Sequence, residues 1–77
     1  MRIRMKADGR VFEGSPEQIV AEMRSVANRD GDGLEDYMRW AADNLRAATG
    51  VTLAADAVRT PDGFVEALLG QGLADRA

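Results

Sequence analysis

The chain has 77 residues with no cysteine, no histidine and a formal net charge of −3, and this length predicts one small domain over residues 1–77. The missing residue types exclude disulfides, thiolate metal sites and a histidine general base. The hydrophobic content of 45% suits a packed core, and no apolar run approaches the roughly 20 residues of a membrane span or forms a signal peptide, so we expect a cytoplasmic protein.

Residues 1–14 predict a β-hairpin. Apolar and basic side chains alternate along its first strand, as they do where one face of a strand is buried. Asp8-Gly9 is typical of a two-residue type I′ turn, in which both central residues have positive φ. Such a turn would pair Arg4 with Glu13, and we expect a weak ion pair between their side chains.

The predicted register gives this hairpin two unlike faces. One face is apolar, and we expect the helices to pack on its side chains Ile3, Met5 and Phe12. The other face is basic and carries Arg2, Arg4 and Lys6, with Arg10 near the tip.

A first amphipathic helix is predicted over residues 15–28. Ser15 is a suitable N-cap, Pro16 favours the first helical position, and Gln18 completes a capping box. The apolar residues recur at helical spacing, and they form one stripe of Ile19, Val20, Met23, Val26 and Ala27.

Two more helices are predicted, over residues 34–49 and residues 60–71. Gly50 is a natural C-cap for the former, and Thr60-Pro61 repeats the cap-plus-proline start for the latter. The predicted core face of the helix at 34–49 consists of Leu34, Met38, Ala41, Leu45 and Ala48.

The remaining segments complete an α+β fold class. Residues 51–53 are extended in character and could add a short third strand to the hairpin, which is marginal alone. The last four residues are expected to fray. We therefore expect a small two- or three-stranded antiparallel sheet, built on the N-terminal hairpin and packed against three helices.

The polar connection at residues 28–33 resembles the first half of an EF-hand calcium loop. The matching residues are Asn28, Asp30, Asp32 and Gly33. The twelfth loop position must supply a bidentate carboxylate, and here it is Arg39, whose charge would repel calcium. The segment is therefore interpreted as a helix–helix turn, and no metal site is predicted.

No residue pattern predicts catalysis or a cofactor. Ser15 and Thr60 are explained as helix caps, and no histidine is present to activate a hydroxyl nucleophile. No glycine pattern matches a phosphate-binding loop. We therefore expect a non-enzymatic protein with neither a cofactor nor a small-molecule substrate.

A partner-binding surface is predicted at Tyr37, Trp40 and Asn44. Trp40 lies about 120° around the helix from the core stripe, at roughly 100° per residue, and Tyr37 lies between them. This flank is either covered by the third helix or contacts a partner, since Tyr and Trp are enriched at interface hot spots. Both interpretations would hold in a homodimer whose interface completes the core.

The basic strand supports an alternative function in DNA binding, through Arg2, Arg4, Lys6 and Arg10. A strand followed by two helices over residues 1–48 resembles the ribbon-helix-helix repressors and antitoxins, which implies strand residues in the major groove. The sequence departs from that family at Glu35 and Asp36, which would repel phosphate at the start of the second helix.

The hairpin and the capped Ser-Pro helix also resemble small uncharacterised bacterial and phage proteins. Abundant alanine and a predominance of arginine over lysine indicate a GC-rich bacterial genome. The leading hypothesis is a non-catalytic protein–protein interaction module, namely an adaptor, an inhibitor or a small subunit of a bacterial or phage assembly. Its partner would be another protein or a second copy of the chain. The alternative is a DNA-binding regulator or antitoxin.

Overall fold

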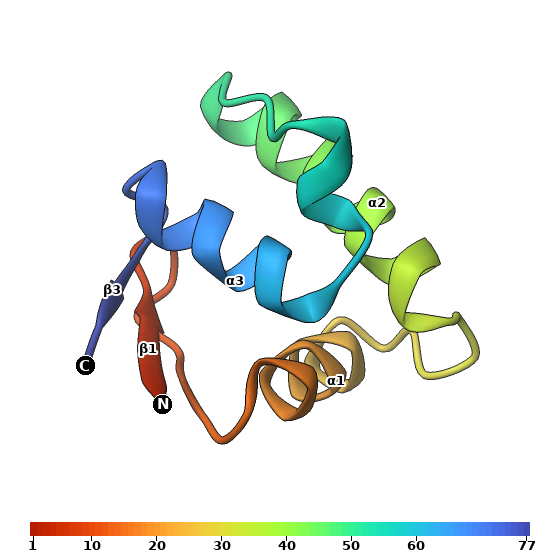
Figure 1. The fold of residues 1–77 in the computed structure, drawn as a ribbon, viewed down its shortest axis with the longest axis horizontal. Helices are drawn as coiled ribbons and strands as arrows, with labels where there is room; N and C mark the ends of the chain where they lie inside the picture. The colour runs from red at the N-terminus through yellow and green to blue at the C-terminus, as the bar shows by residue number, and fades with distance from the viewer.

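The computed structural model describes residues 1–77 and contains a three-stranded antiparallel sheet with three α-helices (Figure 1). In chain order the elements are β1 (Arg2–Met5), β2 (Val11–Glu13), α1 (Pro16–Val26), α2 (Leu34–Thr49), the short 3₁₀-helix η1 (Ala55–Val58), α3 (Pro61–Gly70) and β3 (Ala74–Arg76). The predicted α+β class is confirmed. None of the helices combines the length and apolar character that crossing a membrane requires.

The start of α1 follows the predicted capping box. The Ser15 hydroxyl accepts a hydrogen bond from the Gln18 backbone N–H at 3.1 Å, and the Gln18 side-chain oxygen accepts one from the Ser15 N–H at 2.8 Å. The helix ends at Val26, before the predicted residue 28, because Asn28 adopts a positive φ of 62° that stops helical propagation.

The hairpin is present, but its predicted register is wrong. Arg4 lies opposite Val11 and not opposite Glu13, so the expected Arg4–Glu13 ion pair does not form. The turn is longer than two residues: the Met5 N–H donates to the Arg10 carbonyl at 2.8 Å. Asp8 does not take positive φ as a type I′ turn requires, and its carboxylate instead accepts from the Arg10 N–H at 2.9 Å.

This register differs from the predicted one by two residues, so each side chain keeps its predicted face. Ile3, Met5 and Phe12 are all buried, which confirms the apolar face of the hairpin. They are three of the 14 buried residues in one core cluster, to which α1 and α3 contribute Ile19, Val20, Met23, Phe64, Val65 and Leu68.

The third strand is not the predicted one. Residues 51–53 form no strand, although Leu53 is buried in the core. The second edge of β1 is instead occupied by β3, giving the sheet order β2-β1-β3. The expected fraying of the C-terminus is also wrong, because Ala74 is 1% exposed and the Ala77 N–H donates to the Arg2 carbonyl at 2.9 Å.

The helices form two layers above the sheet. α1 and α3 pack on its apolar face, and α2 packs against both of them from the other side (Figure 1). Two residues of the predicted helix stripes lie outside the core, since Val26 is 46% exposed and Ala48 is also exposed. Both occupy the last turn or two of their helices, where no other element covers them, and both lie beside the cavity described next.

Candidate functional site

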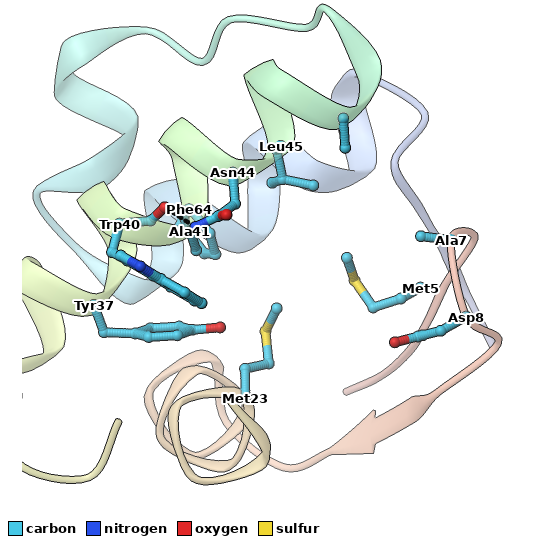
Figure 2. A pocket seen from close by; sticks show the side chains of 11 residues that line it. Met5, Ala7, Asp8, Met23, Tyr37, Trp40, Ala41, Asn44, Leu45 and Phe64 are labelled. Carbon is cyan, nitrogen blue, oxygen red and sulfur yellow. Dashed lines mark hydrogen bonds between the residues drawn. The ribbon is translucent and has the colours of Figure 1, made fainter. Parts of the chain in front are cut away.

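An apolar cavity of about 250 Å³ opens between α2, α1 and the turn of the hairpin (Figure 2). Met5 from β1 and Met23 from α1 lie at its base, and both thioether side chains extend toward α2. One wall is the face of α2 that carries Trp40, Asn44, Leu45 and Ala48, and the facing wall is the hairpin turn at Ala7 and Asp8.

A second depression of about 180 Å³ continues the first one toward the end of α1. The two share Met5, Asp8, Met23 and Tyr37, so they form one continuous surface feature. The second depression ends at Phe12 and the exposed side chain of Val26. We call this combined feature the methionine groove, defined by Met5, Met23, Val26, Tyr37, Trp40 and Leu45.

Tyr37 places an unused hydrogen-bonding group in this groove. The residue is only 4% exposed, and its hydroxyl points toward Met23 across the groove (Figure 2). None of the side-chain hydrogen bonds of the chain involves this hydroxyl. Burial raises the pKa of Tyr37 above 10.0, because the phenolate is desolvated. The hydroxyl is not one of the buried unpaired polar atoms of the chain, so it reaches the surface of the groove and is free to bond to a ligand there.

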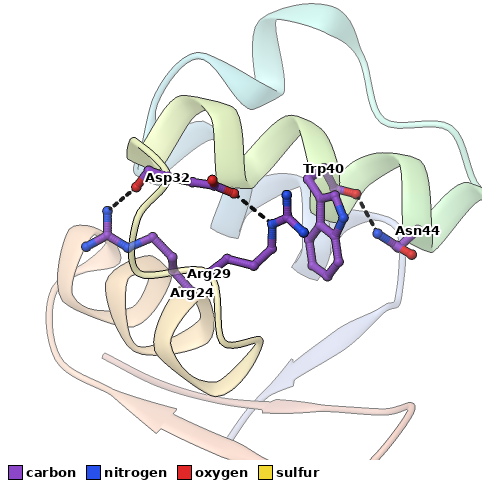
Figure 3. Close-up of polar contacts among 5 residues, drawn as sticks. All are labelled: Arg24, Arg29, Asp32, Trp40 and Asn44. Carbon is purple, nitrogen blue, oxygen red and sulfur yellow. Dashed lines mark hydrogen bonds and ion pairs between the residues drawn. The ribbon is translucent and has the colours of Figure 1, made fainter.

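Trp40 is held in a fixed orientation at the edge of the groove (Figure 3). Its ring lies 5.9 Å from the Tyr37 ring between centroids, with 36° between the ring planes. The guanidinium carbon of Arg29 lies 4.3 Å from the centroid of the indole ring, and Arg29 Nε in turn donates to Asp32 Oδ2 at 2.7 Å. Asn44 Nδ2 donates to the Trp40 carbonyl at 2.9 Å. These contacts leave the indole half-buried and part of the groove wall.

The loop between α1 and α2 is organised by hydrogen bonds between its own side chains and α1. Asp30 accepts a hydrogen bond from the Ser25 hydroxyl at 2.6 Å, and the Asp32 carbonyl accepts one from Arg24 Nη1 at 2.9 Å. The Arg24 Nε is buried without a partner. No three His, Cys, Asp or Glu side chains are grouped as metal ligands. The Asp32 carboxylate holds Arg29, whose guanidinium lies over the Trp40 ring.

The predicted partner-binding residues Tyr37, Trp40 and Asn44 all line the groove, but they differ in exposure. Tyr37 is buried, Trp40 is half-buried and Asn44 is exposed. Sequence reasoning missed the contribution of Met5 and Met23, which it assigned only to the core. The alternating pattern around Met5 and the helical spacing of Met23 indicate only that each side chain is buried. The groove over these side chains depends on where α2 lies relative to the hairpin, which the sequence pattern does not indicate.

Of the basic residues of the alternative function, Arg10 lines the second depression, and the other three lie on the opposite, solvent face of the sheet. Arg2 and Arg4 are exposed on its solvent face and form no ion pair, whereas Lys6 lies 3.7 Å from Asp75 and Arg10 lies 3.3 Å from Asp8. Strand β1 is hydrogen-bonded on both edges, to β2 and to β3. It therefore has no free edge for the intersubunit strand pairing that the ribbon-helix-helix resemblance implies.

Comparison of the chain with protein-family models, with curated proteins and with solved structures gave no match.

Proposed function

We propose that the chain is a non-catalytic protein–protein interaction module, an adaptor, inhibitor or small assembly subunit, that binds its partner in the methionine groove. The observation that carries this proposal is the Tyr37 hydroxyl, which belongs to an otherwise buried side chain, faces an apolar groove and has no partner in the chain. Because this hydroxyl still reaches solvent at the surface of the groove, a ligand that covers the groove must replace water as its hydrogen-bond partner.

The lining of the groove favours a protein partner. Methionine side chains such as Met5 and Met23 adapt to the shape of what they contact, and they are frequent at protein-binding surfaces. Tyr37 and Trp40 belong to the residue types that most often supply interface hot spots.

Site-specific photo-cross-linking tests this proposal in cells that express the chain. A benzophenone amino acid replaces Ala48, which is exposed and lines the groove, and Arg46 serves as the control position on another face of α2. We expect a discrete cross-linked protein from position 48 and none from position 46. Cross-links of equal yield from both positions, or none from position 48, would refute binding in the groove.

DNA binding by the solvent face of the sheet is a second candidate, favoured by one observation. Arg2 and Arg4 are exposed, unpaired and side by side on the central strand. Their positive charge is offset by two carboxylates on the neighbouring strands, although no ion pair forms. Glu13 lies opposite Arg2, and Asp75 lies opposite Arg4. This function predicts DNA binding that weakens steeply with salt and is lost when Arg2, Arg4 and Lys6 are replaced by alanine. Failure of the chain to retain mixed DNA at low salt would exclude it.

A further inference from the structure

The base of the methionine groove presents two thioether side chains, Met5 and Met23, to an open cavity. We infer that Met23 is a site of reversible oxidation by hydrogen peroxide, with the Tyr37 hydroxyl as the hydrogen-bond donor to the sulfoxide oxygen. The oxidation itself does not depend on the proposed function. Its effect on a bound partner rests on that function, and a separate experiment tests it.

The four methionines of the chain differ in how far their side chains reach solvent. Met1 is 40% exposed and Met38 is 1% exposed, whereas Met5 and Met23 are each 8% exposed. Met5 and Met23 line both depressions of the groove, and Met38 lines neither. A cavity of about 250 Å³ admits several molecules of the size of water, and hydrogen peroxide has only one more oxygen atom. Peroxide can therefore reach both groove methionines in the folded chain.

The oxidation transfers one oxygen atom and needs no co-reactant other than peroxide. A lone pair of the Met23 sulfur attacks one peroxide oxygen, and the bond between the two oxygens breaks. The proton on the transferred oxygen passes to the departing hydroxide, which leaves as water. The sulfur is oxidised, the peroxide is reduced, and the product has a polar sulfoxide where the thioether was apolar. A sulfoxide oxygen turned toward an apolar groove is stable only if a donor satisfies it.

The Tyr37 hydroxyl supplies a donor on the Met23 side of the groove. It faces Met23 and takes part in none of the side-chain hydrogen bonds of the chain (Figure 2). A thioether sulfur is only a weak acceptor, so oxidation gives this hydroxyl a stronger one. On the Met5 side Figure 2 shows Asp8, whose carboxylate is paired with Arg10 and accepts hydrogen bonds but donates none. Met5 is therefore the matched comparison for Met23.

NMR of methionine methyl groups labelled with carbon-13 tests the oxidation in the intact chain. Single leucine variants at positions 5, 23 and 38 assign the signals, since leucine nearly conserves the volume of methionine. In the initial phase of peroxide treatment, the signals of Met5 and Met23 should move to sulfoxide positions well before that of Met38. Met38 should react only through unfolding, which slows its oxidation by at least about 100-fold. Equal initial rates for Met23 and Met38 would overturn the inference.

Tyr37→Phe tests the hydrogen bond to the sulfoxide. In a Met5→Leu background, Met23 is the only groove methionine, and the urea midpoint is compared before and after oxidation. The midpoint should fall further with Tyr37→Phe than without it, by about 0.5–1.5 M for one hydrogen bond at an m-value of about 1 kcal/mol/M. In a Met23→Leu background, Tyr37→Phe should add no further loss. Equal losses with and without the hydroxyl, or unfolding of the oxidised Met5→Leu chain in the absence of urea, would refute the hydrogen bond.

The sulfoxide also makes the apolar base of the groove polar, which should weaken the contact with a bound protein. Peroxide treatment before photo-cross-linking from position 48 should lower the yield severalfold for the wild type. It should not do so when Met5 and Met23 are both leucine. An unchanged yield in the wild type, or equal losses in both chains, would refute control of binding by oxidation. Absence of any cross-link from position 48 without peroxide would refute the proposed function, whereas the NMR rates decide on Met23 in the isolated chain.

Discussion

Replacing Trp40 by alanine tests whether this residue is part of the groove wall or part of the core. The substitution removes the aromatic contact with Tyr37 at 5.9 Å, worth about 0.5–1.5 kcal/mol. It also removes the stacking of Arg29 at 4.3 Å, worth about 0.5–1 kcal/mol at an exposed site. The better helix propensity of alanine offsets about 0.5 kcal/mol. The free energy of unfolding should therefore fall by about 0.5–2 kcal/mol.

A loss of this size leaves the variant folded, because a domain of this length has a net stability of about 3–5 kcal/mol. Urea unfolding followed by far-ultraviolet circular dichroism should show a midpoint lower by about 0.5–2 M, at an m-value of about 1 kcal/mol/M. Cross-linking from position 48 should also decrease in this folded variant. A loss above about 3 kcal/mol would instead identify Trp40 as a core residue.

A double-mutant cycle with Arg29→Ala isolates the contact between the guanidinium and the indole. We expect a coupling free energy of about 0.5–1 kcal/mol between the two substitutions. Zero coupling would refute the reasoning that the loop positions Arg29 to stabilise Trp40. The Asp32 carboxylate loses its partner in both variants that lack Arg29, so that effect cancels in the cycle.

The other predictions concern Tyr37, the start of α1 and the C-terminal strand. Tyr37→Phe should change the free energy of unfolding at neutral pH by less than about 0.5 kcal/mol, because it removes a hydroxyl without a partner. Cross-linking of the partner from position 48 should decrease in the same variant. A large loss of stability would instead reveal a hydrogen bond made by the hydroxyl. Because the pKa of Tyr37 is raised in the folded chain, the phenol loses its proton at a lower pH in the unfolded chain. The free energy of unfolding of the wild type should therefore decline above pH 10.0, and Tyr37→Phe should lack this part of the decline. The absorbance of tyrosinate reports this group alone, since the chain has one tyrosine. Gly14→Ala should lower the free energy of unfolding by about 1–3 kcal/mol, because φ is +131° and a Cβ would lie 2.6 Å from Gln18 Oε1. The control Gly31→Ala, whose Cβ meets nothing within 4 Å, should change that free energy little. Equal urea midpoints for the two variants would contradict this reasoning. Deletion of Ala74–Ala77 should largely unfold the chain or cause it to self-associate, as circular dichroism and sizing would show, because it removes β3 and opens an edge of β1.

The helices were predictable from sequence because their signals are local. Ser15 and Gln18 form the capping box that their spacing indicates, and α2 begins at Leu34 and ends at Thr49 as predicted. The Asp8-Gly9 pair correctly predicted the position of the turn but not its length. Of these two residues only Gly9 has positive φ, and the connection between the strands contains more residues than a type I′ turn. Turn residues constrain register only when the turn type is known.

The third strand and the groove could not be predicted because both depend on contacts between distant segments. Residues 51–53 have more β-branched character than Ala74–Arg76, yet the latter form the strand, because the end of α3 directs them along the free edge of β1. The helical wheel correctly grouped Tyr37 with Trp40. It did not indicate that Tyr37 would be buried, nor that Met5 and Met23 would face the same groove.

The position of β1 between β2 and β3 has a consequence for how the chain acquires its structure during synthesis. β1 leaves the ribosome before every other element of this fold, whereas β3 leaves after all of them. Until β3 emerges, the nascent chain can pair only one edge of its central strand, and the other edge stays open to incorrect partners. Closing the sheet then requires a contact across nearly the full chain length, which slows folding. Before β3 is synthesised, β1 carries a charged face made by Arg2, Arg4 and Lys6. Charged side chains on an unpaired strand suppress edge-to-edge aggregation.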